Sequence, residues 1–330
     1  MGQMNTLSRK IGQKFQMRLD QLAPEILHEI FSNLSYRERL PAKLCSKALN
    51  AAATGAPLAL GKVSFMEYFD EFDEANQGVS IVLRTDEFEM NFNSPGYKSK
   101  DTLMDVYIQN ARRRHNTETI ENQEIRDVAR KYLRKLILPT NVSCDSFETN
   151  YRYTANFLEN SEIIKTKKFR VLKSGKPQNA GFIHGWLPHL KPSNLRDIAV
   201  YKSDEDFSFV GFENGLSSLN TLHVLQRSSL NDNVLLSLKA LDIEMEQAEI
   251  TANGINTLIQ RWTGQSVPRG SRFVYYYVAP TGRFPIQQLV QNIHNVSLWT
   301  ENKAFIPIGS DRILIVYVDS KAVHVECFKK

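Results

Sequence analysis

The chain has 330 residues, of which 42% are hydrophobic and 23% charged, a composition typical of folded proteins that excludes a largely disordered chain. Its three widely spaced cysteines, Cys45, Cys144 and Cys327, exclude a disulfide framework or a zinc cluster. They favour a reducing compartment, so we expect a cytoplasmic or nuclear protein, or one found in both. No apolar run reaches the roughly 20 residues of a membrane helix, and we expect no membrane partner.

Of the net charge of +5, +4 originates in residues 1–18. All four charged residues of this segment are basic: Arg9, Lys10, Lys14 and Arg18. The rest of the chain is nearly neutral, with thirty-seven basic and thirty-six acidic residues, so we expect no nucleic-acid partner. We interpret residues 1–18 as a disordered basic tail, and N-myristoylation of Gly2 remains an alternative because Thr6 stands at the required offset.

Residues 22–34 carry the pattern of a short amphipathic helix. Pro24 suits the first helical turn, where its missing N–H is not needed, and Glu25 complements the positive end of the helix dipole. Apolar residues then recur at helical spacing: Ile26, Leu27, Ile30, Phe31 and Leu34. The spacing predicts one wide apolar stripe along this helix.

A second helical stripe follows Ser35, which we expect to act as a helix cap. Its members are Leu40, Leu44, Cys45, Ala48, Leu49 and Ala52. Pro41 is expected to break a continuous helix from Arg37 to Cys45. Two or three such short helices cannot bury both stripes against each other, so part of this surface should meet another protein or the following domain.

Together these two stripes resemble the F-box, a small helical module that docks on a Skp-type adaptor. The match runs from Leu22 and Pro24 to the segment Leu44-Cys45-Ser46-Lys47. The resemblance implies that the adaptor links the chain to a cullin-RING ubiquitin ligase and that the remaining residues capture a protein substrate. The adaptor-binding residues that it implies are Leu22, Pro24, Ile26, Leu27, Ile30, Phe31, Leu34, Leu40, Leu44 and Cys45. The alternative is an ordinary helical hairpin that packs on its own domain.

Thr54-Gly55-Ala56-Pro57 marks the end of the helical unit. We therefore divide the chain into a tail (1–18), an F-box (19–55) and a substrate-recognition domain (60–330). Within the last of these, residues 79–92 are predicted to form two short strands around a turn at residues 84–87. Residues 101–111 and 122–138 are predicted to form helices.

Beyond residue 165, a six-residue pattern recurs with apolar residues at its first, fourth and sixth positions. Its copies are Leu195/Ile198/Val200, Leu219/Leu222/Val224, Leu238/Leu241/Ile243 and Phe273/Tyr276/Val278, with Phe169 and Leu172 as a partial earlier copy. The first two steps, of 24 and 19 residues, are close to the roughly 20–29-residue period of leucine-rich repeats. The asparagine typical of such repeats is missing, so we predict degenerate leucine-rich-repeat-like strand–helix units.

The last predicted elements are a helix capped by Thr251 and a β-hairpin around the turn at residues 319–321. The order of strands, repeat-like units, helix and hairpin resembles the F-box-associated domains of nematode F-box proteins. The predicted fold class is therefore α+β, with a helical F-box, an α/β repeat-like domain and a C-terminal hairpin.

No catalytic constellation is apparent in the sequence. His184 and His189 lack the further ligands of a metal site, and Cys144 has no partner that would activate it. We therefore expect no metal, no cofactor and no catalysis by this chain. The function that we predict is that of a non-catalytic substrate receptor, and the alternative is a repeat-type interaction protein that acts without a ligase.

Two groups of residues are candidates for binding the substrate. Arg112, Arg113 and Arg114 form the densest basic cluster, which could contact an acidic or phosphorylated segment, or less favourably RNA; the alternative is a solvated helix end. Strand alternation predicts that Tyr276 is buried, with Tyr275 and Tyr277 exposed as recognition anchors or simply packed on the strand.

Overall fold

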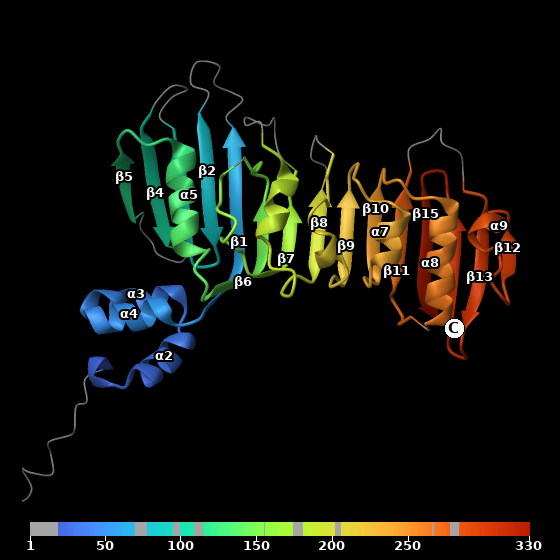
Figure 1. Cartoon of the computed structure of the whole chain (residues 1–330), viewed down its shortest axis with the longest axis horizontal. Coiled ribbons are helices and arrows are strands. Elements are labelled where there is room, and N and C mark those ends of the chain that lie inside the picture. Colours follow the sequence, from blue (N-terminus) through green and yellow to red (C-terminus); the bar gives the residue numbers. More distant parts are fainter. Residues whose placement is uncertain are drawn as a thin grey trace, which may run out of the picture. The chain divides into compact units, whose positions relative to one another are not determined.

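The computed structural model describes residues 19–69, 78–94, 100–108, 115–154, 156–173, 181–201, 206–265, 267–277 and 284–330. They belong to two compact units. The first runs to Leu60 and includes Thr140–Ser143, and the second comprises Gly61–Pro139 and Cys144–Lys330. The chain has N-terminal helices followed by a strand-rich unit with some helices, a mixed α+β organisation (Figure 1). No helix among the described residues is long and apolar enough to cross a membrane.

The first unit is helical. Its elements are η1 (Leu19–Gln21), α2 (Pro24–Ser32), α3 (Tyr36–Cys45) and α4 (Lys47–Gly55). The helix predicted from residue 24 is confirmed, whereas the second apolar stripe is divided between α3 and α4. Ser46 separates them because its backbone is extended (φ −159°, ψ 160°) and its hydroxyl accepts a hydrogen bond from the Leu49 N–H at 3.2 Å.

The predicted break at Pro41 is wrong, since Pro41 lies inside α3. A capping box fixes the start of this helix. Ser35 Oγ accepts from the Glu38 N–H at 3.4 Å, and Glu38 Oε2 accepts from the Ser35 N–H at 2.9 Å. Pro41 removes one backbone donor from a helix that is stabilised at its first turn, and the helix continues past it.

The described strands form one fifteen-stranded sheet in the order β12-β13-β14-β15-β11-β10-β9-β8-β7-β6-β1-β2-β3-β4-β5. At one end lie β1 (Leu58–Phe69), β2 (Val79–Thr85), β3 (Phe88–Asn93), β4 (Thr102–Ile108) and β5 (His115–Ile120), which form an antiparallel meander. α5 (Ile125–Leu136) packs on β2 and β3. The two strands and the helix predicted for β2, β3 and α5 are confirmed.

The helix predicted over residues 101–111 is wrong, because residues 102–108 form β4. Thr102, Val106, Tyr107 and Ile108 are residue types that favour strands, and β4 pairs with both β3 and β5. Pairing on both sides overrides the helical spacing of the apolar residues.

Six strands in the middle of the sheet run parallel and follow one another in chain order. They are β6 (Val142–Thr149), β7 (Thr166–Val171), β8 (Asp197–Tyr201), β9 (Thr221–Leu225), β10 (Asp242–Glu246) and β11 (Arg272–Tyr276). The returns between them contain η2 (Ile183–His189), α6 (Glu213–Leu216), α7 (Asp232–Ser237) and α8 (Ala252–Gly264). The predicted Thr251 cap of α8 is confirmed by its hydrogen bond from the Gly254 N–H.

The strand register corrects the alignment of the six-residue pattern. Ile198 pairs with Leu222 and Val200 with Val224, as the first two copies predict. However, Leu222 and Val224 pair with Ile243 and Met245, which in turn pair with Phe273 and Tyr275. The third copy was therefore placed two residues too early. The fourth and the partial copy were placed three residues too late, because Phe273 and Phe169 lie in the column of Ile198, which holds the fourth position of the pattern. Apolar residues next to these columns, such as Leu241 and the buried Val274, made the phase of the pattern ambiguous.

The C-terminal part contains α9 (Ile286–Leu289), β12 (Ser297–Thr300), β13 (Lys303–Ile308), β14 (Arg312–Val318) and β15 (Ala322–Lys329). The predicted terminal hairpin is confirmed as β14 and β15. It does not form the end of the sheet, because β15 pairs antiparallel with β11 and the outermost strand is β12.

Candidate functional site

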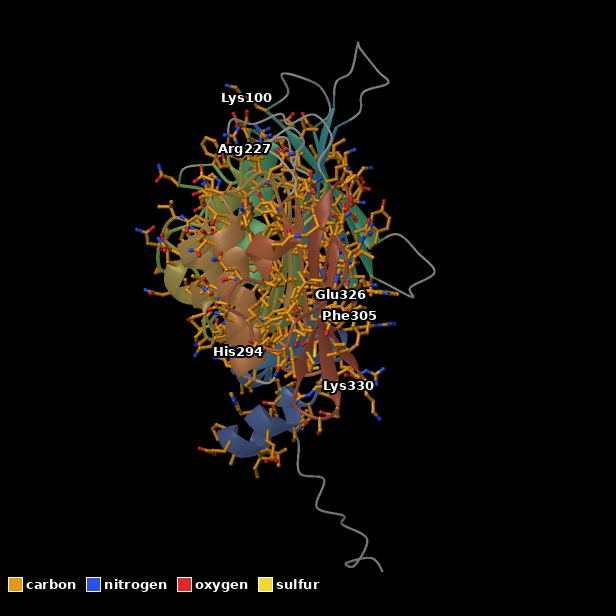
Figure 2. The ribbon with its side chains drawn as sticks, turned by 90° about the vertical axis from the view of Figure 1, so that its right-hand side faces the viewer. Lys100, Arg227, His294, Phe305, Glu326 and Lys330 are labelled. Carbon is orange, nitrogen blue, oxygen red and sulfur yellow. The ribbon has the colours of Figure 1, made fainter. Side chains whose placement is uncertain are left out.

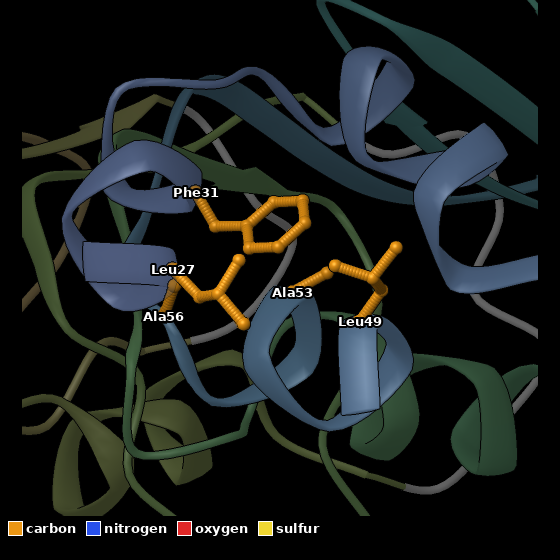
Figure 3. Close-up of a cluster of buried hydrophobic side chains, with 5 residues drawn as sticks. All are labelled: Leu27, Phe31, Leu49, Ala53 and Ala56. Atoms are coloured by element: carbon orange, nitrogen blue, oxygen red, sulfur yellow. The ribbon is translucent and has the colours of Figure 1, made fainter. Parts of the chain in front are cut away.

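The helical unit has an apolar core of its own. Leu27 and Phe31 from α2 meet Leu49 and Ala53 from α4, together with Ala56 (Figure 3). Four partly buried residues pack around this core: Leu22, Leu34, Ala42 and Ala52. Leu27 and Phe31 are only 4% and 1% exposed, so they hold the module together and present almost no surface to a partner.

Arg39 is buried beside this core, although it is charged. Its Nε donates to the Leu34 carbonyl at 2.9 Å, and its Nη1 donates to the carbonyls of Ala56 at 3.0 Å and Ala53 at 3.3 Å. Its Nη2 donates to the Pro57 carbonyl. These carbonyls include the negative end of α4, which a cation complements. The apolar spacing gave no signal for this residue.

Asn141, from a distant part of the chain, closes the same helix end. Its Nδ2 donates to the carbonyls of Thr54 at 2.8 Å and Ala56 at 2.7 Å. The backbone carbonyl of Asn141 accepts a hydrogen bond from the Leu58 N–H at 2.9 Å. The last turn of α4 is thus held by two side chains that donate to its carbonyls.

The ten residues predicted to bind an adaptor divide into three groups by exposure, since two of them, Leu27 and Phe31, belong to the core. Ile26 and Leu44 are exposed, at 48% and 90%, as are Pro24 and Cys45. The other four outside the core, Leu22, Ile30, Leu34 and Leu40, are partly buried. The expectation that Leu27 and Phe31 supply docking surface is wrong. The apolar stripe of α2 is wide, so one side of it is buried in the core of the module and the other side, which includes Ile26, stays exposed.

The sheet of the second unit has a face that its helices leave uncovered, which we call the open face. Figure 2 shows Phe305 and Glu326 on the side of the sheet away from the helices. The register aligns one residue from each of ten neighbouring strands into a row on this face. The row is Thr300, Lys303, Tyr317, His324, Val274, Glu244, His223, Ala199, Arg170 and Glu148.

Polar groups in the middle of the open face are held in fixed positions. Glu244 accepts hydrogen bonds from the Tyr276 hydroxyl at 2.9 Å and from Arg272 Nη1 at 3.3 Å. The rings of Tyr317 and His324 are stacked with their centroids 4.1 Å apart. Contacts within the protein therefore orient these side chains before any partner binds.

Asp319 fixes the turn beside this stack. Its Oδ1 accepts from the N–H groups of Lys321 at 2.6 Å and Ala322 at 2.7 Å, and its Oδ2 lies 3.1 Å from His324 Nε2. Partial burial alone raises the pKa of Asp319, but these hydrogen bonds outweigh it, so the pKa lies below its usual value.

The predicted orientation of the three tyrosines is wrong. Tyr275 and Tyr277 are buried, and their hydroxyls donate to the carbonyls of Ala248 at 2.6 Å and Asp319 at 2.7 Å. Tyr276 is the tyrosine that lies on the open face. The prediction was inverted because the fourth copy of the pattern was misplaced. Arg112, Arg113 and Arg114 lie outside the described residues, as do residues 1–18.

His189 and Cys144 are both buried inside the protein. His189 is buried between the Tyr153 hydroxyl, 2.6 Å from Nε2, and the Glu162 carbonyl, 2.9 Å from Nδ1. Burial raises the pKa of the Cys144 thiol to about 11, which keeps it protonated at neutral pH. The described residues bring together no group of three or more His, Cys, Asp or Glu side chains suited to a metal ion.

Comparison with known proteins gives one positive result. The family model of the F-box domain matches residues 19–58, which contain the buried core and the exposed Ile26 and Leu44. The chain matches no curated protein and no solved structure.

Proposed function

We propose that this chain, which carries an F-box domain at residues 19–58, is a substrate receptor of a Skp–cullin–F-box ubiquitin ligase. In this proposal the F-box docks on a Skp-type adaptor, and the strand-rich unit holds a protein substrate. The chain supplies no reacting group, and ubiquitination is accelerated because the substrate is held close to a ubiquitin-charged enzyme. The observation that carries the proposal is the F-box match.

The exposed edge of the module supports an adaptor contact. Ile26 and Ile30 are one helical turn apart on α2, as are Leu40 and Leu44 on α3. Burial of one such side chain contributes about 1.5–3 kcal/mol, so an aspartate at Ile26 or Leu44 is expected to weaken binding by at least about tenfold.

Co-purification with a Skp-type adaptor tests this role. We expect the wild type to bind, and Ile26→Asp combined with Leu44→Asp to lose the adaptor while circular dichroism stays unchanged, because both positions are exposed. Val210→Asp is the matched control, since Val210 is 78% exposed and lies outside the F-box. Phe31→Asp is unsuitable, because it would place a charge in the core.

Two results would contradict the proposal. One is a folded wild type that does not bind the adaptor, and the other is a double variant that binds as well as the wild type. Either result would favour the second candidate, a protein-interaction module that acts without a ligase. The open face favours that candidate, because its fixed polar and aromatic groups do not depend on the F-box.

We further assign the strand-rich unit to degenerate leucine-rich-repeat-like proteins of the nematode F-box-associated type. The buried column that supports this assignment is Phe147, Phe169, Ile198, Leu222, Ile243 and Phe273. Its successive spacings of 22, 29, 24, 21 and 30 residues are close to the roughly 20–29-residue repeat period. We also propose that the protein acts in a reducing compartment, the cytoplasm or the nucleus, because its three cysteines are widely spaced.

A further inference from the structure

β12 forms an open edge of the sheet. Among the described residues no strand pairs with its outer side, and all four of its residues are exposed. Leu298 and Trp299 are large apolar side chains that are 54% and 67% exposed. Sheet edges are usually blocked by proline, charge or a covering segment, because their unpaired N–H and C=O groups attract other strands. The strand Ser297–Thr300 contains neither proline nor charge, and its only edge-limiting features are its length of four residues and a bulge between Leu298 and Thr300.

An aromatic and cationic cluster lies beside this edge. The Trp299 ring packs on Phe305 with their centroids 5.3 Å apart. The ammonium of Lys303 lies 4.9 Å from the centroid of Trp299, 5.4 Å from that of Phe305 and 6.0 Å from that of Tyr317. Within the described part of the chain, the ammonium contacts these three rings, and no carboxylate pairs with it.

We propose that β12 binds an extended segment of a partner protein, which adds to the sheet as a further strand. On the open face this segment presents an apolar residue to Trp299 and Phe305 and, two positions away, a carboxylate to Lys303. The residue between them faces Leu298 on the other side and is also apolar, because side chains alternate along a strand. The backbone pairing supplies affinity, and the carboxylate supplies selectivity.

Charge complementarity selects this occupant over a second copy of the chain. Ser297–Thr300 carries no acidic side chain, so two β12 edges paired with each other would bring no carboxylate from within the strand to Lys303. That the bound segment belongs to a substrate rests on the proposed function, whereas the binding itself does not.

Trp299 provides a direct readout. The chain has three tryptophans, and Trp186 and Trp262 are buried, so acrylamide should quench mainly Trp299. The probe is a pool of short tryptophan-free peptides with a central apolar-apolar-acidic triplet, compared with a pool that carries lysine in place of the acid. We expect the acidic pool to protect Trp299 from quenching and the lysine pool to do so about tenfold less well.

Charge reversal tests the role of Lys303. Lys303→Glu should exchange the preference between the two pools, whereas Lys329→Glu, the matched change at an exposed lysine near the end of β15, should leave it unchanged. Methylation of alternate backbone nitrogens in the acidic peptides tests whether they add to the sheet as a strand. One alternate set should abolish protection and the other should not, because only every second N–H faces the neighbouring strand.

Three results would overturn the proposal: no protection by the acidic pool, equal protection by both pools, or protection that depends only on protein concentration, which would identify a second copy as the occupant. Failure here is distinguishable from failure of the proposed function. Lys303→Glu should still co-purify with the Skp-type adaptor, and the Ile26→Asp and Leu44→Asp variant should still bind the acidic pool.

Discussion

Arg39 places a permanent charge inside the helical unit and satisfies four carbonyl groups. Arg39→Met should retain much of the apolar packing but remove the side-chain donor of the Leu34, Ala53 and Pro57 carbonyls, whereas the Ala56 carbonyl keeps its hydrogen bond from Asn141. We expect it to destabilise the unit by about 2–4 kcal/mol. Arg39→Lys should lie in between, because an ammonium cannot reproduce the fork of a guanidinium. Thermal unfolding followed by circular dichroism measures both effects.

Arg37→Met is the control for this prediction, since Arg37 is exposed on the same helix. Equal destabilisation by the Arg37 and Arg39 variants would show that the buried guanidinium contributes nothing beyond an ordinary surface arginine.

Asp319 makes the turn between β14 and β15 sensitive to acid. Its pKa is lower in the folded state, so its contribution to stability is fully present above the unfolded value of about 3.9 and is lost as pH falls through the folded pKa. We expect the hydrogen-exchange protection factors of the Lys321 and Ala322 amides to fall over this range. Asp319→Asn retains an acceptor but cannot titrate, and an identical pH dependence in this variant would contradict the assignment.

At the scale of single residues, the sequence located the apolar stripe of α2 but not which of its side chains are buried. Helical spacing defines a stripe, and the same stripe contains the buried Phe31 and the exposed Ile26. Which part is covered depends on where α4 packs, and this is not encoded within α2. Arg39 and Asn141 were missed for a similar reason, because their partners are backbone carbonyls that have no sequence signature.

The contact between α7 and α8 requires a residue without a side chain at position 254, which is Gly254. Asp232 accepts hydrogen bonds from the Thr251 N–H at 2.9 Å and the Thr251 hydroxyl at 2.6 Å, and a Cβ at Gly254 would collide with the Asp232 carboxylate. Gly254→Ala should therefore destabilise the second unit by about 1–3 kcal/mol, although alanine favours helices.

A double-mutant cycle with Asp232→Ala separates the collision from a general effect of alanine. The effect of Gly254→Ala, measured by urea unfolding, should be smaller when Asp232 is absent, because the collision is then relieved. Additive effects of the two substitutions would contradict this account.

Elements were predictable where local signals agreed. α8 and the β14–β15 hairpin combine clear periodicity with a cap or turn residues, and α5 has clear periodicity and ends before Pro139; all three were predicted correctly. β4 was not, because its strand conformation is imposed by pairing with β3 and β5. Pro41 misled in the opposite direction, since a well-capped helix tolerates the loss of one donor.

Over the whole molecule, β1 joins the two parts of the sheet, since it lies between β6 and β2. Removal of residues 1–56 leaves β1 complete, and we expect the remaining chain to fold as a soluble monomer. Removal of residues 1–69 exposes the edges of both neighbours and should cause aggregation, which size-exclusion chromatography measures. Equal behaviour of the two truncated chains would show that β1 is dispensable.

The overall topology was only partly predictable. Recurring apolar pairs indicated neighbouring parallel strands, but nothing local indicates that β6 pairs with β1 or that β15 is inserted beside β11. Such pairings join segments far apart in sequence, and their partners are chosen by which edges remain open.

Asn141 has a consequence for the order of events on the ribosome. Its side chain reaches back 87 residues to the carbonyl of Thr54. A nascent chain therefore exposes all of its F-box helices long before the residue that closes the end of α4 has been made, and β1 must wait equally long for β6. Until then the module lacks the hydrogen bonds that Asn141 donates to the end of α4. These bonds can form only after the first strands of the following unit have been synthesised.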